Sequence, residues 1–174
     1  NRQPVRFIVV RDQDKRNQLA ELYRGPWKAY LADAQTGDIN IGSDKAARLL
    51  RNADYFADHL EDVPVMVVAC AHLEDTHPTD TELGRLSVVG GASIYPAVQN
   101  FILGCREAQL GASLTTLLCL FEPQVKELLG MPEDAATVAH IAVGHRTKEF
   151  PTKLDRMGLE EIVFSETWGA STYS

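Results

Sequence analysis

The sequence lacks the features that mark several large classes of protein. No apolar run reaches about 18 residues, the length that a membrane-spanning helix requires. No basic stripe is present, and the net charge of −7 argues against a nucleic-acid-binding surface. The chain also contains no low-complexity segment and no internal repeat. Its 174 residues are therefore expected to form a single domain that binds neither membrane nor nucleic acid.

Cysteine is scarce, and its positions do not have the spacing of metal ligands. Cys70, Cys105 and Cys119 each lie among apolar residues, which is typical of buried, reduced thiols. His72 and His77 lie in an acidic loop without the tight spacing of a metal site, and a solvated loop is the preferred interpretation. We expect a cytoplasmic protein without a metal centre.

The familiar signatures of protein-based catalysis are also missing. There is no G-x-G-x-x-G nucleotide motif and no Ser/His/Asp set with a recognisable spacing. His140 lies within an apolar run and is expected to be a hydrogen-bonded sheet residue, not a catalytic base. Such a sequence fits an enzyme whose cofactor performs the reaction, because the protein then supplies binding, orientation and electrostatics. We therefore predict no catalytic residue in the chain.

The most informative stretch covers residues 90–130. Apolar residues at helical spacing over residues 94–108 predict a long, buried central helix. Ser93 could cap its start, Pro96 is tolerated in its first turn, and Gly111 is placed for a left-handed cap at its end.

An apolar passage and a second helix follow the central helix. Residues 114–121 are apolar almost throughout and should be buried. Glu122 and Pro123 begin a short helix, which Gly130 ends, with Pro132 just beyond as a stop signal.

The rest of the chain predicts further helices and short strands. Residues 12–23 predict a helix that Gly25-Pro26 breaks or bends, and residues 27–34 resume the helical pattern. Another helix, capped by Ser43, carries an inward apolar stripe from Ala46 to Leu60. A polar loop is expected at residues 72–89, and strands at residues 5–10, 64–71, 137–144 and 159–164.

An ordered set of motifs resembles the FMN-dependent nitroreductase family. The motifs are A-x-Q-N at residues 97–100, L-G at 110–111, a threonine pair at 115–116, a segment E-P-x-V-x-E-L-L-G-M-P-E-D from residue 122, and A-x-I-A-V-G-H at 139–145. The first four residues also resemble the family's N-x-Q-P-W segment, with Val5 in place of the tryptophan. The resemblance covers most of the chain.

The resemblance implies a fold and an assembly. The fold would be α+β, a mixed sheet flanked by helices, in a single domain over residues 1–174. The protein would be an intertwined homodimer with the helix of residues 90–111 at its centre. The tail of residues 147–174 would wrap onto the partner subunit.

The resemblance also implies the chemistry. An FMN-dependent oxidoreductase of this family takes hydride from NADH or NADPH and then passes electrons to a small acceptor such as a nitroaromatic or a quinone, in a ping-pong cycle. Nothing in the sequence selects the acceptor or the nicotinamide donor.

Cofactor-binding positions follow from matching the family's motifs to this chain. The turn after L-G would present a backbone N–H to the flavin, the N-x-Q-P segment would approach the ring, and basic residues of the tail would hold the phosphate. The candidates are Asn1, Gln3, Ser113, Thr115, Thr116, Lys153 and Arg156. Each also has a plainer interpretation, as an ordinary turn, as β-type residues in an apolar passage, or as solvated surface charge.

One departure from the family leaves two alternatives open. Members of the family begin with helices whose arginine motif grips the phosphate, and this chain starts after that motif. Losing two charge-assisted hydrogen bonds would weaken flavin binding by about a hundredfold or more. The chain is therefore interpreted either as part of a longer enzyme or as a degenerate relative that binds flavin weakly and acts as a flavin-sequestering or dimerisation protein.

Overall fold

The computed structural model describes residues 2–35, 44–154 and 156–171. Four strands and five α-helices are described, and the chain order begins with β1 (Val5–Val10), α1 (Gln13–Gln35), α2 (Asp44–Asp58) and β2 (Val65–His72). It continues with α3 (Tyr95–Glu107), β3 (Leu110–Thr115), α4 (Glu122–Leu129), β4 (Ala135–His145) and α5 (Leu159–Ile162). None of the helices in these ranges has the length and apolar character that a membrane crossing would require.

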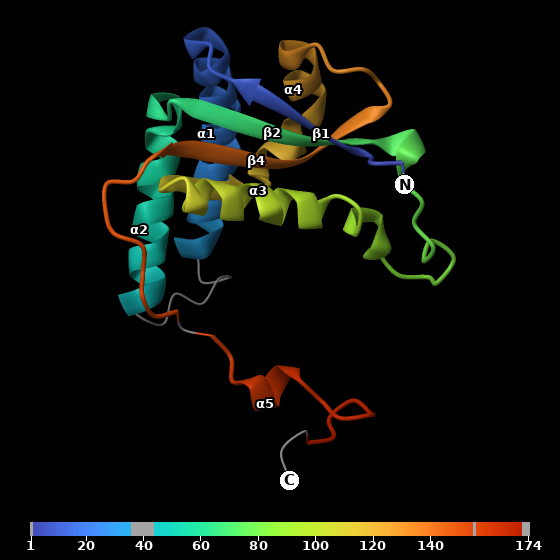
Figure 1. The fold of residues 1–174 in the computed structure, drawn as a ribbon. Coiled ribbons are helices and arrows are strands. Elements are labelled where there is room, and N and C mark those ends of the chain that lie inside the picture. Colours follow the sequence, from blue (N-terminus) through green and yellow to red (C-terminus); the bar gives the residue numbers. More distant parts are fainter. Residues whose placement is uncertain (1, 36–43, 155, 172–174) are drawn as a thin grey trace.

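The four strands form one antiparallel sheet in the order β1-β2-β4-β3. Helices α1 and α4 cover one face, α2 packs beside α1, and α3 crosses the other face (Figure 1). The α+β architecture predicted from the sequence is confirmed. The strands predicted at residues 5–10, 64–71 and 137–144 are present as β1, β2 and β4.

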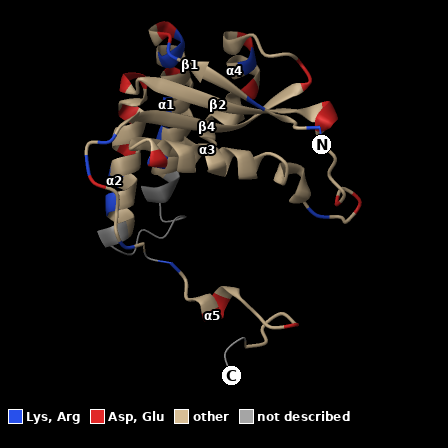
Figure 2. Cartoon of the chain, viewed as in Figure 1, with Lys and Arg blue, Asp and Glu red and all other residues tan. Residues whose placement is uncertain are grey.

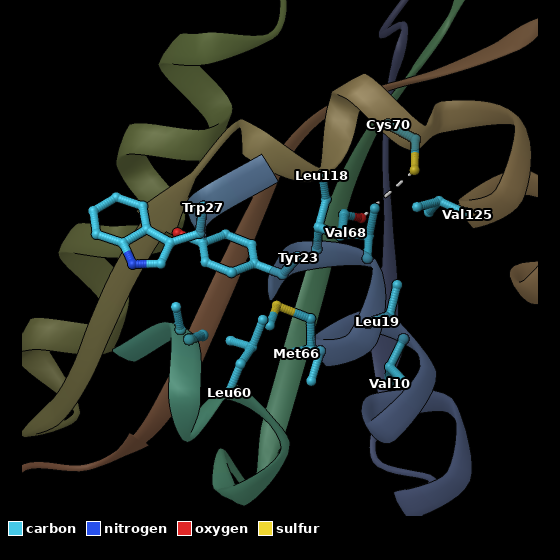
Figure 3. Packing of buried hydrophobic residues seen from close by; sticks show 13 residues of the cluster. Val10, Leu19, Tyr23, Trp27, Leu60, Met66, Val68, Cys70, Leu118 and Val125 are labelled. Atoms are coloured by element: carbon cyan, nitrogen blue, oxygen red, sulfur yellow. Dashed lines mark hydrogen bonds between the residues drawn. The ribbon is translucent and has the colours of Figure 1, made fainter. Parts of the chain in front are cut away.

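Alternation along β2 divides the buried residues into two clusters. Met66, Val68 and Cys70 belong to the cluster under α1, and Val67 and Ala69 belong to the cluster under α3. This is the two-residue period of a strand that is covered on both faces. The α1 cluster is the larger one, and it draws buried residues from eight helical or strand elements (Figure 3).

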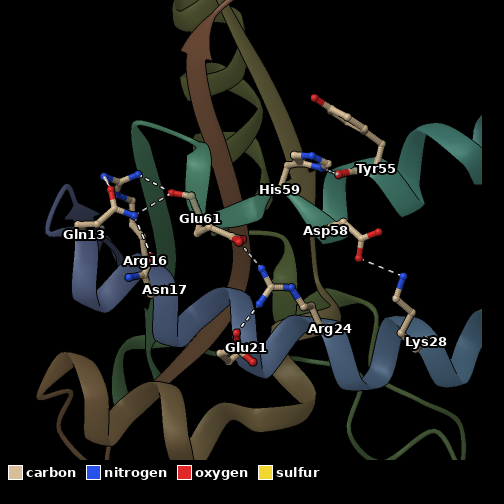
Figure 4. Close-up of polar contacts among 10 residues, drawn as sticks. All are labelled: Gln13, Arg16, Asn17, Glu21, Arg24, Lys28, Tyr55, Asp58, His59 and Glu61. Atoms are coloured by element: carbon tan, nitrogen blue, oxygen red, sulfur yellow. Dashed lines mark hydrogen bonds and ion pairs between the residues drawn. The ribbon is translucent and has the colours of Figure 1, made fainter.

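A polar network fastens the first helix to the segment after α2. Arg24 pairs with both Glu21 and Glu61, and Arg16 Nη1 donates to the Glu61 carbonyl oxygen over 2.8 Å (Figure 4). Lys28 Nζ lies 2.9 Å from the Asp54 carboxylate and 3.1 Å from that of Asp58. These contacts fix α2 and the 3-10 turn η1 (Leu60–Asp62) against α1.

Of the two outcomes predicted at Gly25-Pro26, a break or a bend, the break is wrong. Helix α1 continues through Pro26, although a proline inside a helix removes one backbone hydrogen bond. Tyr23 and Trp27 are buried on either side of it, and Trp27 Nε1 donates to Asp54 over 2.9 Å. Tertiary packing therefore outweighs the local preference for a break.

Both predicted caps of the central helix are wrong, although the helix itself is confirmed. Ile94 occupies the N-cap position without a side-chain cap, so Ser93 does not cap the helix, while Pro96 lies in the first turn as expected. At the other end Gln109, with φ 59°, takes the left-handed position. Gly111 lies within β3 opposite Gly144, because pairing with β4 starts directly after the helix.

The passage and the second helix show a mixed outcome. Helix α4 ends at Leu129, and Gly130 has a left-handed φ of 63°, as predicted. Leu118 is fully buried, but Leu120 is 69% exposed and Leu114, on the edge strand β3, is 42% exposed. Uniform burial of residues 114–121 is therefore wrong.

Two further predictions are wrong, one on the burial of a side chain in α2 and one on the type of the last element. Leu49, placed in the inward stripe of α2, is 58% exposed. The predicted final strand is a short helix, α5, whose preceding Gly158 N–H donates to the Glu161 carboxylate over 3.0 Å. A carboxylate that accepts N–H bonds at a helix start favours the helix over a strand. The predicted cap Ser43 lies outside the described residues.

Candidate functional site

A hollow of about 880 Å³ lies where the start of the chain meets the start of α3. Its walls come from the segment before β1, from the turn η2 (Leu73–Asp75) with the residues after it, and from residues 89–100. Its volume is in the range of pockets that hold small organic ligands.

The hollow brings together two motifs that are distant in the sequence. Gln3 lines it from the first segment, and Ala97 and Asn100 of the A-x-Q-N motif line it from α3. Ser93 and Pro96 add the entry of the helix to the wall. The two segments meet here because the first segment runs along the end of β2, where the His72 N–H donates to the Pro4 carbonyl oxygen over 2.8 Å.

Gln3 has an unusual backbone. Its φ is 50°, a left-handed value that non-glycine residues rarely adopt. Its carbonyl oxygen accepts a hydrogen bond from Arg6 Nη1 over 2.6 Å, which holds this turn closed at the edge of the hollow. Strained backbone of this kind gathers at functional sites.

The loop between β2 and α3 is organised around one carboxylate. Asp80 is only 4% exposed and accepts hydrogen bonds from Ser87 Oγ (2.6 Å), Arg85 Nη1 (2.8 Å) and the Val88 N–H (2.9 Å). These donors, with Ser87 the strongest influence, hold the pKa of the Asp80 carboxyl well below its ordinary value. The cluster fixes the segment that leads into Val89, which lines the hollow.

A histidine joins two neighbouring turns beside the hollow. His72 Nε2 lies 2.7 Å from the Asp134 carboxylate, and its Nδ1 lies 3.1 Å from that of Asp75. Asp75 itself lines the hollow. Across the described ranges, no group of three His, Cys, Asp or Glu side chains could hold a metal ion.

Three of the predicted cofactor-binding residues lie at the opposite edge of the sheet. Ser113 and Thr115 belong to β3 and pair with Ala142 and His140 of β4. Thr115 Oγ1 accepts a hydrogen bond from the Leu117 N–H over 3.2 Å, which shapes the turn after Thr116. Because β2 and β4 lie between β1 and β3, this turn and Gln3 occupy opposite edges of one protomer.

The predicted phosphate-binding residues lie in a third place. Lys153 and Arg156 are exposed in the tail, which extends away from the sheet toward α5 (Figure 1). Asn1 is outside the described residues. One protomer thus provides hydroxyl, amide and cationic groups of the kinds that suit a ring edge and a phosphate, but it does not assemble them at one point.

His140 departs from its predicted role as a hydrogen-bonded residue. Its backbone lies in β4 opposite Val68, but its ring is fully buried and both ring nitrogens lack a hydrogen-bond partner within the described part of the chain. Burial lowers the pKa of His140 to about 4, so the ring is neutral at pH 7. The expectation of a satisfied ring is wrong.

Sequence interpretation missed Arg2, Arg6 and Asp80. A carboxylate followed by Gly84 and Ser87 is a common loop composition, so no local signal distinguishes Asp80. Arg2 and Arg6 reach the hollow only because β1 pairs with the distant strand β2.

The chain is similar to known proteins in sequence and in fold. The sequence model of the Nitroreductase family matches residues 1–145. Similar solved structures include the NADPH:FMN oxidoreductase of Vibrio harveyi complexed with NAD+, at 21% identity and a TM-score of 0.63 over 96% of this chain and 60% of that one. Nitroreductase A of Vibrio parahaemolyticus RIMD 2210633 is similar at 19% identity and a TM-score of 0.62, over 95% of this chain and 58% of that one.

A third similar structure is an iodotyrosine deiodinase bound to FMN and 3-iodo-L-tyrosine. Its identity is 17% and its TM-score is 0.66, over 95% of this chain and 77% of that one. These similarities concern the fold. The chain spans about three-fifths of the length of the two Vibrio proteins.

Proposed function

Because the chain belongs to the nitroreductase family, we propose that it forms the core of an FMN-dependent NAD(P)H oxidoreductase. The observation that carries the proposal is the family match over residues 1–145, together with a hollow lined by the matching motifs of Gln3 and residues 97–100. The fold is shared with flavin oxidoreductases, one of them complexed with NAD+. The three cysteines of the chain are free, as suits a cytoplasmic enzyme.

In this proposal FMN supplies the hydride and electron transfer, and the protein supplies the binding site. The turn of Ser113, Thr115 and Thr116 would bind the ring edge, and Gln3 would contact the ring from the other segment. Lys153 and Arg156 would hold the phosphate, since directional cationic donors suit a dianion. Nitroaromatics, quinones or related electron-poor molecules would be the acceptors, alternating with NADH or NADPH in one site.

A homodimer would bring these three places together. The tail exposes six large apolar side chains, and such a surface marks an interaction site. They are Leu154, Met157, Leu159, Ile162, Val163 and Trp168. Helix α3 also exposes Leu103 on its outer side, at 52%. A second copy that covers α3 and receives the tail would place Lys153 and Arg156 of one protomer near the other protomer's ring site.

The phosphate role of Arg156 can be tested directly. Arg156→Ala should weaken FMN binding by about tenfold, the value of one charge-assisted hydrogen bond. Fluorescence quenching of FMN on titration with protein measures this. Arg51→Ala, an exposed arginine of α2, is the matched control. An unchanged FMN affinity of Arg156→Ala would remove Arg156 from the site.

The function is tested by the visible spectrum of the purified protein after addition of FMN and desalting. A retained flavin band that bleaches with NADH or NADPH, and recovers with a quinone or a nitroaromatic, is the expected result. The rival function is weak flavin binding without turnover. It predicts a flavin band that is lost on desalting and no oxidation of NADH or NADPH.

A further inference from the structure

Two arginines line the hollow without an acidic partner. Arg2 Nη1 donates to the Glu74 carbonyl oxygen over 3.2 Å, and Arg6 Nη1 donates to the carbonyl oxygens of Gln3 (2.6 Å) and Val5 (2.9 Å). In the described part of the chain no carboxylate forms an ion pair with either of them.

Some arginines of the chain have acidic partners. Arg24, Arg85 and Arg146 each pair with a carboxylate. Arg2 and Arg6 instead contact backbone oxygens at the edge of the hollow. Figure 2 shows basic residues at the start of the chain beside the acidic turn η2.

The contacts with backbone oxygens orient the two arginine side chains and leave further N–H donors of each guanidinium available. A guanidinium carries five N–H donors, and each of these arginines uses only one nitrogen in the contacts above. Carbonyl oxygens at Glu74 and Gln3 fix one side of each group, which reduces the entropy lost when an anion binds to the other side.

Apart from one carboxylate, the rest of the hollow favours an anion or is neutral. That carboxylate is Asp75, and His72 Nδ1 lies 3.1 Å from it. Ser93 and Pro96 stand at the start of α3, a helix of 13 residues whose dipole is positive at this end. Asn100 adds an amide donor.

We propose that the hollow binds the anionic group of a substrate, a carboxylate or a phosphate, through Arg2 and Arg6. A volume of about 880 Å³ accommodates an organic molecule that carries the anion and not the ion alone. The inference rests on the proposed function, because the anion belongs either to the electron acceptor or to the nicotinamide donor. Both substrates would share one anion site, and a carboxylated or phosphorylated substrate would be preferred over its neutral analogue.

The test compares matched ligands on the full chain with FMN added. Isothermal titration calorimetry measures binding of 4-nitrobenzoate against 4-nitrobenzamide, and of NADPH against NADH. The proteins are the wild type, the double variant Arg2→Gln/Arg6→Gln, and Arg51→Gln as a control that removes an exposed arginine on α2. Circular dichroism and the melting temperature confirm that all three are folded.

The expected result is that the double variant binds the member of a pair that carries the extra anionic group, 4-nitrobenzoate or NADPH, about tenfold more weakly. It binds 4-nitrobenzamide, or NADH without the 2′-phosphate, as before. Loss confined to 4-nitrobenzoate assigns the site to the acceptor, and loss confined to NADPH assigns it to the donor's 2′-phosphate. The Arg51→Gln protein should match the wild type. If the wild type and the double variant bind the members of both pairs equally, the proposal is overturned.

The calorimetric result does not depend on turnover. A protein whose arginines select 4-nitrobenzoate but whose flavin is never reduced by NADH or NADPH would retain this anion site and reject the oxidoreductase function. A protein that turns over both members of each pair equally, in both variants, would retain the function and reject the anion site.

Discussion

Strand β1 shows how differently the two faces of the sheet are covered. Toward α1 it sends Ile8, partly buried, and Val10, which is 4% exposed. Toward α3 it sends Phe7 and Val9, which are 39% and 55% exposed. The side chains are alike in hydrophobicity, so the difference lies in what the chain provides to cover them.

The α1 face is complete within one chain. Three helices and the polar network of Arg24, Arg16 and Lys28 close it. Among the residues that the structure describes, a single helix covers the α3 face. Its Phe101 stacks on Phe7 with 5.6 Å between ring centroids but leaves the edge open. The comparison teaches that this chain's own helices cover one face, whereas the other face leaves apolar side chains exposed.

Removal of the tail should have the largest effect of the changes considered, because it would abolish the assembly that we propose at the α3 face. Deleting residues 152–174 removes the six exposed apolar side chains of the tail, and we expect monomers or insoluble protein in place of a dimer. Size-exclusion chromatography with light scattering measures the mass. A stable dimer after this deletion would show that the tail does not join the subunits.

Truncation of a core side chain should separate the two faces by energy. Leu19→Ala removes a fully buried side chain of the α1 face and should cost about 3 kcal/mol. Leu103→Ala, 52% exposed on α3, should cost under about 1 kcal/mol of monomer stability but weaken the dimer. Urea unfolding measures the stability, and the concentration dependence of the dimer measures the association. Equal losses of stability would contradict the comparison.

Acid should act on the α1 face through His140, which faces the same side of the sheet as Ala142 of that cluster. The unfolded chain takes up a proton near pH 6.5, whereas burial lowers the pKa of His140 in the folded protein to about 4. The contribution of the neutral His140 ring to the free energy of unfolding is therefore fully present above pH 6.5, and it is lost as the pH falls toward 4. The loss should reach about 3 kcal/mol.

A variant of the same position is the control for that loss. In His140→Val the stability between pH 6.5 and pH 4 should fall less than in the wild type, because the group that takes up the proton on unfolding is gone. Urea unfolding at pH 7, 5.5 and 4 gives the comparison. Parallel pH profiles for the two proteins would exclude His140 as the cause.

The smallest effect is expected at the loop beside the α3 face. Asp80→Ala removes the acceptor of the Val88 and Val89 N–H groups and should speed hydrogen exchange of these amides by about tenfold, with little change in global stability. Asp80→Glu should restore part of the protection. Exchange measured by NMR that is equally slow in all three proteins would show that the loop is held by other contacts.

The strands β2 and β4 and the end of α4 could be predicted because their signals are local. Apolar runs and the glycine at position 130 carry the information within a few residues. The continuity of α1 could not be predicted from local sequence, since it depends on the hydrogen bond from Trp27 to Asp54 in another helix. The position of Gly111 in a strand, and not at a helix cap, likewise depends on its pairing with Gly144.

The candidate site was predictable only in part for the same reason. Gln3 and residues 97–100 were identified by motif, and the hollow brings them together. Its arginines were missed because Arg2 contacts Glu74, 72 positions along the chain. Ser113, Thr115, Lys153 and Arg156 remain predictions, because their convergence would require a second subunit.

The Asp80 loop has a consequence for how such proteins diversify. Every hydrogen bond that Asp80 accepts comes from a residue within nine positions of it. The hydrogen bonds that shape this loop therefore come from its own sequence and not from the sheet. Evolution, or a protein engineer, could exchange the whole loop for another. Such an exchange would change which molecules reach the hollow and leave the sheet and its helices intact.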